Sequence, residues 1–173
     1  MLGMFGAVRL WGRWSKMGAV VALALLAADQ AHKYWMLGPF DIAARGRVAL
    51  TPFLDLVMVW NRGISYGLFQ QDSQAGRWIL IAVTLFALAA LVLWLAATSA
   101  RMTALAFGLV IGGAMSNMID RLVHGAVADF FLFHIWGYEW YVFNLADAGI
   151  VAGVGWLLYD SLFNRHKSAA NGP

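Results

Sequence analysis

The sequence predicts an all-α integral membrane protein with four membrane-spanning helices and a small β-region outside the membrane. The 173-residue chain is 62% hydrophobic and only 12% charged, which is far from the balance of a soluble globular protein. Four of its segments are mostly apolar over about 20 residues, the length that crosses the hydrocarbon core. The chain also contains nine Trp, and several of them lie near the expected ends of these segments, as in the interfacial belts of membrane proteins.

The predicted spans cover residues 17–36, 78–97, 102–119 and 142–163. The second is the clearest, because no charged residue occurs from Trp78 to Ala100. The first follows several basic residues and has a short apolar core, so it could be mistaken for a signal peptide. We interpret it as a helix that stays in the protein, since no convincing small-residue cleavage site follows the core.

The distribution of Lys and Arg predicts the orientation of the chain. Such residues lie before the first span, between the second and third, and after the fourth: Arg9, Arg13, Lys16, Arg101, Arg165 and Lys167. Because cytoplasmic loops carry an excess of Lys and Arg, both termini are predicted to be cytoplasmic. The longer segments 37–77 and 120–141 are then extracytoplasmic, although the first of them also holds several Arg. The whole chain is predicted to be one membrane-embedded domain.

Both extracytoplasmic segments contain strand patterns. Residues 47–60 are rich in Val, Leu and Phe and have turn residues at both ends, which predicts one or two short strands. Residues 126–143 are aromatic and β-branched, and Gly137 is the expected point of a hairpin. These two segments form the predicted β-region.

Composition and motifs exclude several functional classes. No basic run exceeds a few residues, so nucleic-acid binding is not expected. The chain has no Cys, which excludes disulfides, thiolate nucleophiles and cysteine metal sites. Its four His residues follow no ligand spacing, and HExxH and P-loop motifs are absent from the sequence. We therefore expect neither a metal nor an organic cofactor.

Two carboxylates near the ends of predicted spans, Asp129 and Asp147, are the strongest candidates for chemistry. An ionisable group at the membrane is costly and usually faces the interior of the protein. If these two acids meet, they could share a proton and activate a water molecule. The alternative is two unrelated acids at the membrane interface, and the residues alone leave both interpretations open.

The first span carries a charged pair. Asp29 and Lys33 are four residues apart with the acid first, which is the favoured order for an ion pair on a helix. A structural salt bridge is the simpler interpretation, and a supporting role beside the site stays open.

The third span carries two stripes of residues. Gly108, Gly112 and Ser116 are small and allow close helix packing. Asn117 and Arg121 lie on the adjacent stripe and need polar partners that lipid cannot supply, so we predict that they serve the site.

Three further features lie close to these residues. Asp120 is expected to pair locally with Arg121 or to face water. Asn144 lies three residues before Asp147, so the two share a helical face. A loop before the second span is a candidate for substrate binding, although its residues could also mark only a turn: Asn61, Arg62 and Gly63.

Together these motifs resemble the lipoprotein signal peptidase family (signal peptidase II) of bacteria. The resemblance extends over nearly the whole chain, and five motifs in one order are specific even though no single motif is decisive. The matching motifs are Asp29-x-x-x-Lys33, Asn61-Arg62-Gly63, Gly112-Gly113-x-x-x-Asn117-x-x-Asp120-Arg121, Val127-x-Asp129-Phe130 and Phe143-Asn144-x-Ala146-Asp147.

The resemblance implies an aspartic intramembrane endopeptidase. We expect the protein to work as a monomer among membrane lipids. Such an enzyme cuts prolipoproteins just before a Cys that carries a diacylglyceryl group and so releases the signal peptide. The catalytic dyad would be Asp129 and Asp147. The residues that would bind substrate or support the site are Asn61, Arg62, Gly63, Asn117, Arg121, Asn144, Asp29 and Lys33. The family also has an interfacial helix beside its β-region.

The chain departs from the family pattern at three places. Ser116 stands where Gly is common, Tyr141 where Pro is frequent, and Ala148 where Ser is frequent. None of these differences removes a catalytic group, although Ala148 removes a hydroxyl that could have supported the site.

Two other functions use the same residues. A small transporter or proton-conducting protein could use the carboxylates as an ion relay, but its charges should lie near the middle of the membrane. A scaffold protein could use the polar helix ends as helix–helix contacts. The predicted position of the acids at one end of the spans favours chemistry at the interface.

Overall fold

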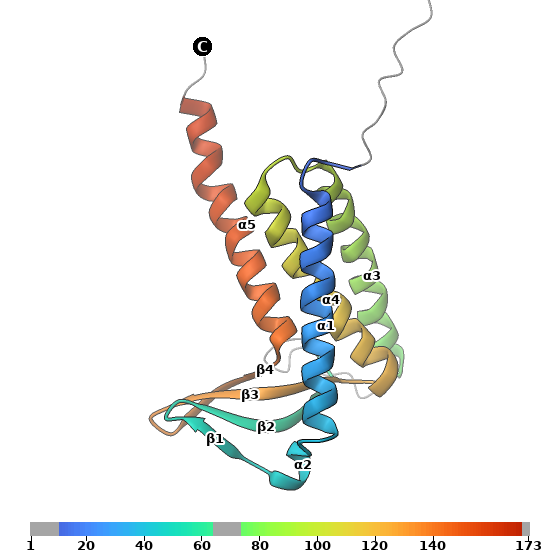
Figure 1. Ribbon diagram of the computed structural model, residues 1–173, viewed down its shortest axis with the longest axis vertical. Helices are drawn as coiled ribbons and strands as arrows, with labels where there is room; N and C mark the ends of the chain where they lie inside the picture. Colours follow the sequence, from blue (N-terminus) through green and yellow to red (C-terminus); the bar gives the residue numbers. More distant parts are fainter. Residues whose placement is uncertain (1–10, 64–73, 171–173) are drawn as a thin grey trace, which may run out of the picture.

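The computed structural model describes residues 11–63 and 74–170, with side chains as far as Phe163. Arg9, one of the residues used to predict orientation, lies outside this range. Four long helices form a bundle, with a small sheet and a one-turn helix at one end (Figure 1). The helices are α1 (Ser15–Leu37), α2 (Ile42–Arg45), α3 (Gln74–Ala97), α4 (Arg101–His124) and α5 (Leu145–Ala170). α1 begins and α5 ends at the end of the bundle opposite the sheet.

Helix α4 is the centre of the bundle and packs against α1, α3 and α5. Its contact with α1 is close because small residues face each other. A Cβ atom on Gly112 would lie 2.4 Å from the carbonyl oxygen of Ala22, and one on Gly108 would lie 2.4 Å from that of Gly18. Ser116 continues this line and is fully buried. The predicted small-residue stripe is thus confirmed as the α1–α4 packing surface.

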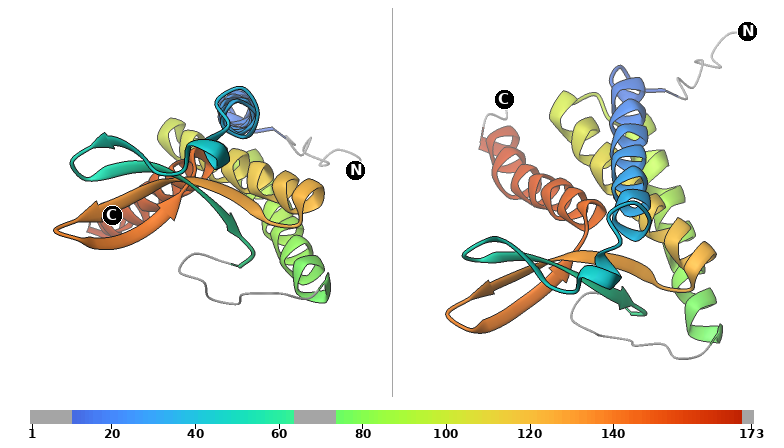
Figure 2. Two further views of the ribbon diagram at one scale, coloured as in Figure 1. Left: turned by 90° about the horizontal axis from the view of Figure 1, so that it is seen from below. Right: turned by 60° about the horizontal axis from the view of Figure 1, so that its bottom comes forward.

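The sheet has four antiparallel strands in the order β1-β2-β3-β4. They are β1 (Val48–Thr51), β2 (Leu54–Asn61), β3 (Val127–Ile135) and β4 (Tyr138–Phe143). The two segments predicted to contain strands therefore join in one sheet, through the pairing of β2 with β3. This sheet extends sideways from the bundle, beneath α5 (Figure 2).

The predicted hairpin at Gly137 is confirmed. Trp136 and Gly137 connect β3 to β4, and both have positive φ angles, 48° and 82°. A two-residue hairpin turn of this kind matches the twist of the strands it joins, and Gly adopts its second position without strain.

One predicted span boundary was wrong, and one helix is longer than its predicted span. The fourth helix begins at Leu145 rather than at residue 142, because Tyr138–Phe143 forms strand β4. The third helix continues past residue 119 to His124 and stops at Gly125, which has a φ of 77°. The polar residues of this added turn have partners inside the protein. The helix can therefore continue past residue 119 without exposing them to water.

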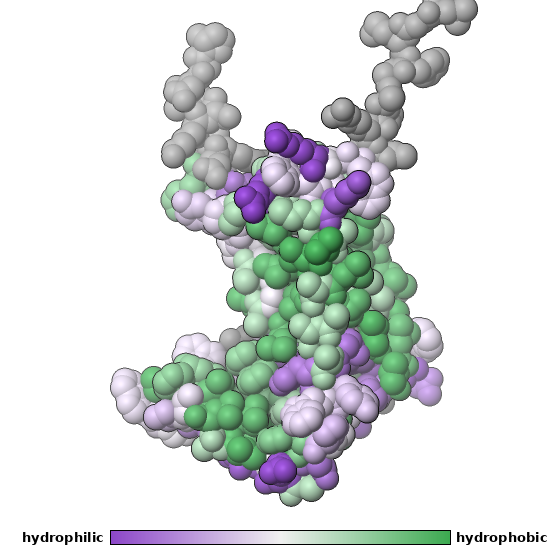
Figure 3. All heavy atoms as spheres, viewed as in Figure 1, coloured by the Kyte–Doolittle hydropathy of each residue, from purple (hydrophilic) through white to green (hydrophobic). Residues whose placement is uncertain are grey.

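Three helices are long and apolar enough to cross a membrane, judged by length and composition among the described residues: α3, α4 and residues 145–163 of α5. Large apolar side chains on these helices face outward, including Phe86, Leu93 and Val151, which are 80%, 69% and 71% exposed. On the face shown in Figure 3, a hydrophobic band crosses the middle of the bundle, with hydrophilic residues toward its ends. Such a surface suits a hydrocarbon environment.

Two parts of the predicted fold stay predictions. Helix α1 is 23 residues long but is not among the three apolar helices, so four spans are not confirmed. Helix α2 is a single turn, and residues 64–73 of the same segment lie outside the described range, so an interfacial helix also stays a prediction.

Candidate active site

The two candidate acids lie on different elements and contact the same residue. Asp129 is on β3, and Asp147 is in the first turn of α5. Asn144, the residue before α5, donates from Nδ2 to Oδ1 of Asp129 at 2.6 Å. Its own Oδ1 accepts the backbone N–H of Asp147 at 2.9 Å. The sequence left open whether the acids meet, and the fold brings both into one hydrogen-bond network.

Further amides complete this network. Asn61, at the end of β2, donates to Oδ2 of Asp129 at 3.0 Å. Asn117 of α4 donates to Oδ1 of Asp147 at 2.8 Å and accepts from Asn144 at 3.1 Å. The three predicted Asn residues thus surround the two carboxylates and hold them in fixed positions.

Asp129 is 1% exposed. Burial, and next the negative charge of Asp147, raises the pKa of Asp129 to about 7, although hydrogen bonds from Asn61 and Asn144 act in the opposite direction. Desolvation and a nearby like charge both disfavour the ionised form of a carboxyl group. The pair of acids is therefore able to keep a proton near neutral pH.

Lys33 lies between two buried carboxylates. Its Nζ is 2.7 Å from Oδ2 of Asp29 and 2.7 Å from Oδ2 of Asp120. It also donates to Oδ1 of Asn117 at 3.2 Å. The predicted Asp29–Lys33 pair is confirmed, and the contact with Asn117 connects it to the two candidate acids.

The prediction for Asp120 was wrong. Asp120 neither pairs locally with Arg121 nor faces water: it is 2% exposed, pairs with Lys33 and accepts the backbone N–H of Ala128 at 3.0 Å. The reason is its position on α4. It lies four residues after Ser116, on the side that faces α1, where a buried cation is available.

Sequence reasoning gave no site role to Gln30 and Ser116. Ser116 Oγ donates to Asp29 at 2.6 Å, and Gln30 Nε2 donates to Ser116 Oγ and to Asp120 Oδ1, each at 2.9 Å. The sequence could have indicated a buried role for Gln30, because an uncharged amide in a membrane helix also needs a hydrogen-bond partner. These residues donate hydrogen bonds to the two carboxylates that form ion pairs with Lys33.

The loop after β2 contacts α4. Arg121 donates from Nη2 to the carbonyl oxygen of Gly63 at 2.9 Å and from Nη1 to that of Asn117 at 3.3 Å. Within the described residues, Nε of Arg121 is buried without a hydrogen-bond partner. Arg62 is exposed. The loop is thus tied to α4 through Gly63, and Arg121 keeps one donor for another group.

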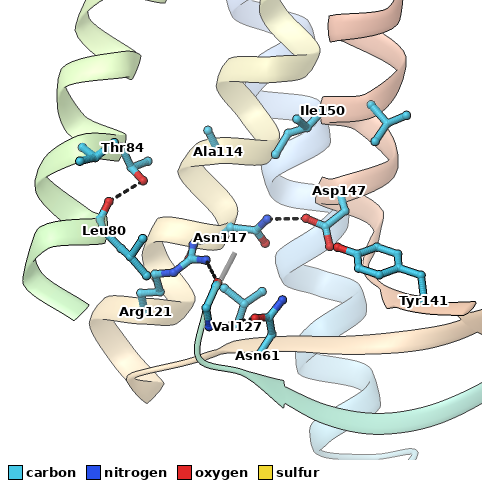
Figure 4. A pocket seen from close by; sticks show the side chains of 13 residues that line it. Asn61, Leu80, Thr84, Ala114, Asn117, Arg121, Val127, Tyr141, Asp147 and Ile150 are labelled. Carbon is cyan, nitrogen blue, oxygen red and sulfur yellow. Dashed lines mark hydrogen bonds between the residues drawn. The ribbon is translucent and has the colours of Figure 1, made fainter. Parts of the chain in front are cut away.

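A pocket of about 460 Å³ lies beside these residues. Asn117, Arg121 and Asp147 form part of its polar side (Figure 4). The apolar side comes from α3, α4 and α5: Leu80, Val83, Ala114, Ile150 and Val151. Asp129 is not among the lining residues, but it accepts a hydrogen bond from Asn61, which is one of them. The pocket thus joins an apolar wall between helices to a polar end with a carboxylate, as ligand sites commonly do.

Comparison with known proteins gives a consistent result. Residues 21–163 match the family model described as signal peptidase (SPase) II. The chain is 54% identical to a lipoprotein signal peptidase from Nitrobacter hamburgensis over 157 residues, covering 88% of this chain and 96% of that protein. It is 53% identical to one from Beijerinckia indica, with 84% and 87% covered.

Two solved structures are similar in fold, and both are described as a bacterial membrane enzyme determined by the in meso method. One, at 2.3 Å resolution, has a TM-score of 0.71 at 27% identity and covers 85% of this chain and 90% of its own. The other, at 1.9 Å, has a TM-score of 0.76 at 25% identity and covers 89% and 97%.

Proposed function

The chain belongs to the signal peptidase II family, and from this premise we propose that it is an aspartic endopeptidase that removes signal peptides from diacylglyceryl-modified prolipoproteins. The cut falls before the lipidated Cys. The observation that carries the aspartic mechanism is the position of Asn144, which hydrogen-bonds to both Asp129 and Asp147. Two acids joined in this way, with the pKa of Asp129 raised to about 7, can act as a pair.

Two nearby carboxylates do not easily ionise together, so Asp129 and Asp147 share one proton. The ionised group takes a proton from a water molecule, which attacks the carbonyl carbon of the scissile bond. The protonated group gives its proton to the carbonyl oxygen as the tetrahedral intermediate forms. Asp147 lines the pocket and lies in the first turn of α5, where the helix dipole favours negative charge.

The pocket indicates how the substrate binds. Its apolar wall between α3, α4 and α5 receives the diacylglyceryl chains and the apolar part of the signal peptide. Burial of these groups away from the cut supplies binding energy that positions the scissile bond. The unpartnered Nε of Arg121 is available to a backbone carbonyl of the substrate.

The proposal includes the topology of the chain. Helix α1 serves as a fourth span, because it packs along α4, carries Asp29 and Lys33 on its buried side, and exposes Val20 and Leu23, at 65% and 61%. Both termini are cytoplasmic, the acids face the outer side of the membrane, and the enzyme works as a monomer. An ion relay is less suitable, because the acids lie where the helices meet the sheet rather than at mid-membrane.

The test is cleavage of a diacylglyceryl-modified prolipoprotein by the purified protein. We expect Asp129→Asn and Asp147→Asn each to lower the rate by about a thousandfold or more while the protein stays folded. Asp41→Asn is a matched control: Asp41 is exposed and has a φ of 48°, a conformation that Asn also tolerates. Folded variants that both retain full activity would disprove the proposal, and ion flux in liposomes without cleavage would support a transporter.

A further inference from the structure

Cationic side chains meet at the end of the bundle opposite the candidate active site. The segment before α1 is tied there to the turn between α3 and α4. Gly12 donates its backbone N–H to Ala96 at 2.7 Å, and the buried hydroxyl of Ser15 donates to the carbonyl of Leu95 at 2.8 Å. A Cβ atom on Gly12 would lie 2.4 Å from the carbonyl oxygen of Thr98. The start of α1 is therefore held firmly against this turn.

This anchoring brings two guanidinium groups onto one indole ring. The Cζ atom of Arg13 lies 5.2 Å from the ring centre of Trp14, and that of Arg101 lies 5.6 Å from the same ring. Lys16 is exposed two residues further along α1. The ion pairs found among the described residues include none with these three cations. Two positive charges are thus gathered at one ring, and Lys16 follows Arg13 by three residues along the chain. Asp160 of α5 is an acid at the same end of the bundle, and it accepts a hydrogen bond from Thr103 Oγ1 at 3.3 Å.

The length of α4 indicates where Arg101 and Trp14 lie along the membrane normal. Arg101 begins this helix, and Arg121 lies at its other end beside the pocket. Twenty residues at 1.5 Å per residue separate them by about 30 Å, which is about the thickness of the hydrocarbon core. If one end lies at one membrane surface, Arg101 and Trp14 lie at the headgroups of the opposite leaflet. Figure 3 shows hydrophilic side chains at this end, above the hydrophobic band.

We propose that Arg13, Lys16 and Arg101 form a binding site for the phosphate of an anionic phospholipid in the leaflet opposite the candidate active site. The planar guanidinium fork matches phosphate oxygens in two-point contacts. Trp is suited to the headgroup level, and its ring holds both guanidinium groups in place. Basic pockets between membrane helices bind anionic headgroups. A bound lipid would fasten the start of α1 to the α3–α4 turn.

The test is native mass spectrometry of the purified full chain with phosphatidylglycerol and phosphatidylcholine of equal acyl composition. We expect the wild type to retain phosphatidylglycerol on the order of tenfold better, and Arg13→Gln/Arg101→Gln to lose this preference. Each single variant should lose part of this preference. The single variants therefore still test the proposal if the double variant unfolds. Arg45→Gln is the matched control, because Arg45 also lies over a ring, that of Phe40 at 4.6 Å, but near the sheet.

Several outcomes would overturn this inference. Equal retention of the two lipids by the wild type would show that these cations only set the orientation of the chain in the membrane. A double variant that keeps the preference, or an equal loss in Arg45→Gln, would place the lipid elsewhere. Protection of the wild type from thermal unfolding by inorganic phosphate as strong as that by phosphatidylglycerol would show a site for free anions. Prolipoprotein cleavage in detergent should be unchanged in the Arg13→Gln and Arg101→Gln variants. The lipid readout is therefore independent of the proposed activity.

Discussion

Lys33 of α1 donates a hydrogen bond to Oδ1 of Asn117 of α4 at 3.2 Å, and this contact fixes which way the Asn117 amide points. An ammonium group has donors only, so the oxygen of the amide must face Lys33. Its NH2 group is then directed to Asp147, where it donates at 2.8 Å. A buried ion on one helix thereby sets the hydrogen bond received by a candidate catalytic acid on another.

Removal of the Lys33 charge should damage both stability and activity. In Lys33→Met, Asp29 and Asp120 remain buried without their shared cation, at 0% and 2% exposure. We expect a loss of about 3–5 kcal/mol in stability and a strong loss of cleavage, measured by thermal unfolding and prolipoprotein processing in detergent. Arg45→Met, at an exposed cation of α2, should change neither. Equal stability of the two variants would contradict this role of Lys33.

Asn144 should affect the rate rather than substrate affinity. It contacts both acids but does not line the pocket. Loss of a hydrogen bond to a charged group costs about 1.5–3 kcal/mol, so Asn144→Ala should lower kcat by about ten- to a hundredfold with little change in KM. Arg121→Lys, at a residue that does line the pocket, should mainly raise KM. A purely higher KM in Asn144→Ala would show that Asn144 binds substrate instead.

The pH dependence of cleavage should report the shared proton. The pKa of Asp129 is raised to about 7, so the pair keeps one proton below that pH and loses it above. Because the mechanism needs one protonated and one ionised acid, kcat/KM should decline on the alkaline side with an apparent pKa of about 7. A rate that stays constant from about pH 6 to about pH 9 would exclude a shared proton as the essential acid.

The same carboxyl group should make stability depend on pH. The usual pKa of an Asp is 3.8, whereas that of Asp129 in the folded protein is about 7. Between these values the folded state holds a proton that the unfolded state has lost, so this contribution to stability decreases as pH rises from about 4 to about 7. Thermal unfolding of Asp129→Asn in detergent should show a weaker decrease over this range than that of the wild type.

The contact between α1 and α4 should not tolerate a side chain at Gly112. A Cβ atom there would lie 2.4 Å from the backbone oxygen of Ala22, and backbone cannot move aside as a flexible side chain can. We expect Gly112→Ala to cost about 1–3 kcal/mol in thermal unfolding. Gly155→Ala on α5 is the control, because nothing lies within 4 Å of its Cβ position. A similar loss in both variants would show that the cost is not one of helix packing.

Part of this molecule follows from local sequence. Apolar length, strand alternation and the hairpin at Gly137 depend on residues that are neighbours in the chain, so the helices and strands were predictable from them. The small-residue stripe from Gly108 to Ser116 and the Asp29–Lys33 pair follow from helical spacing. The family resemblance rests on the same motifs, and the comparisons confirm it.

Other features depend on long-range contacts. The start of α5 was predicted too early because β4 forms only by pairing with β3. Asp120 was assigned to Arg121 or water because its partner, Lys33, is on another helix. The sequence by itself determined which residues carry charge and which segments are apolar, since composition and spacing are local. Only the tertiary structure decided that Asp129 and Asp147 share Asn144, because a strand and a helix from separate segments must first pack together to bury them.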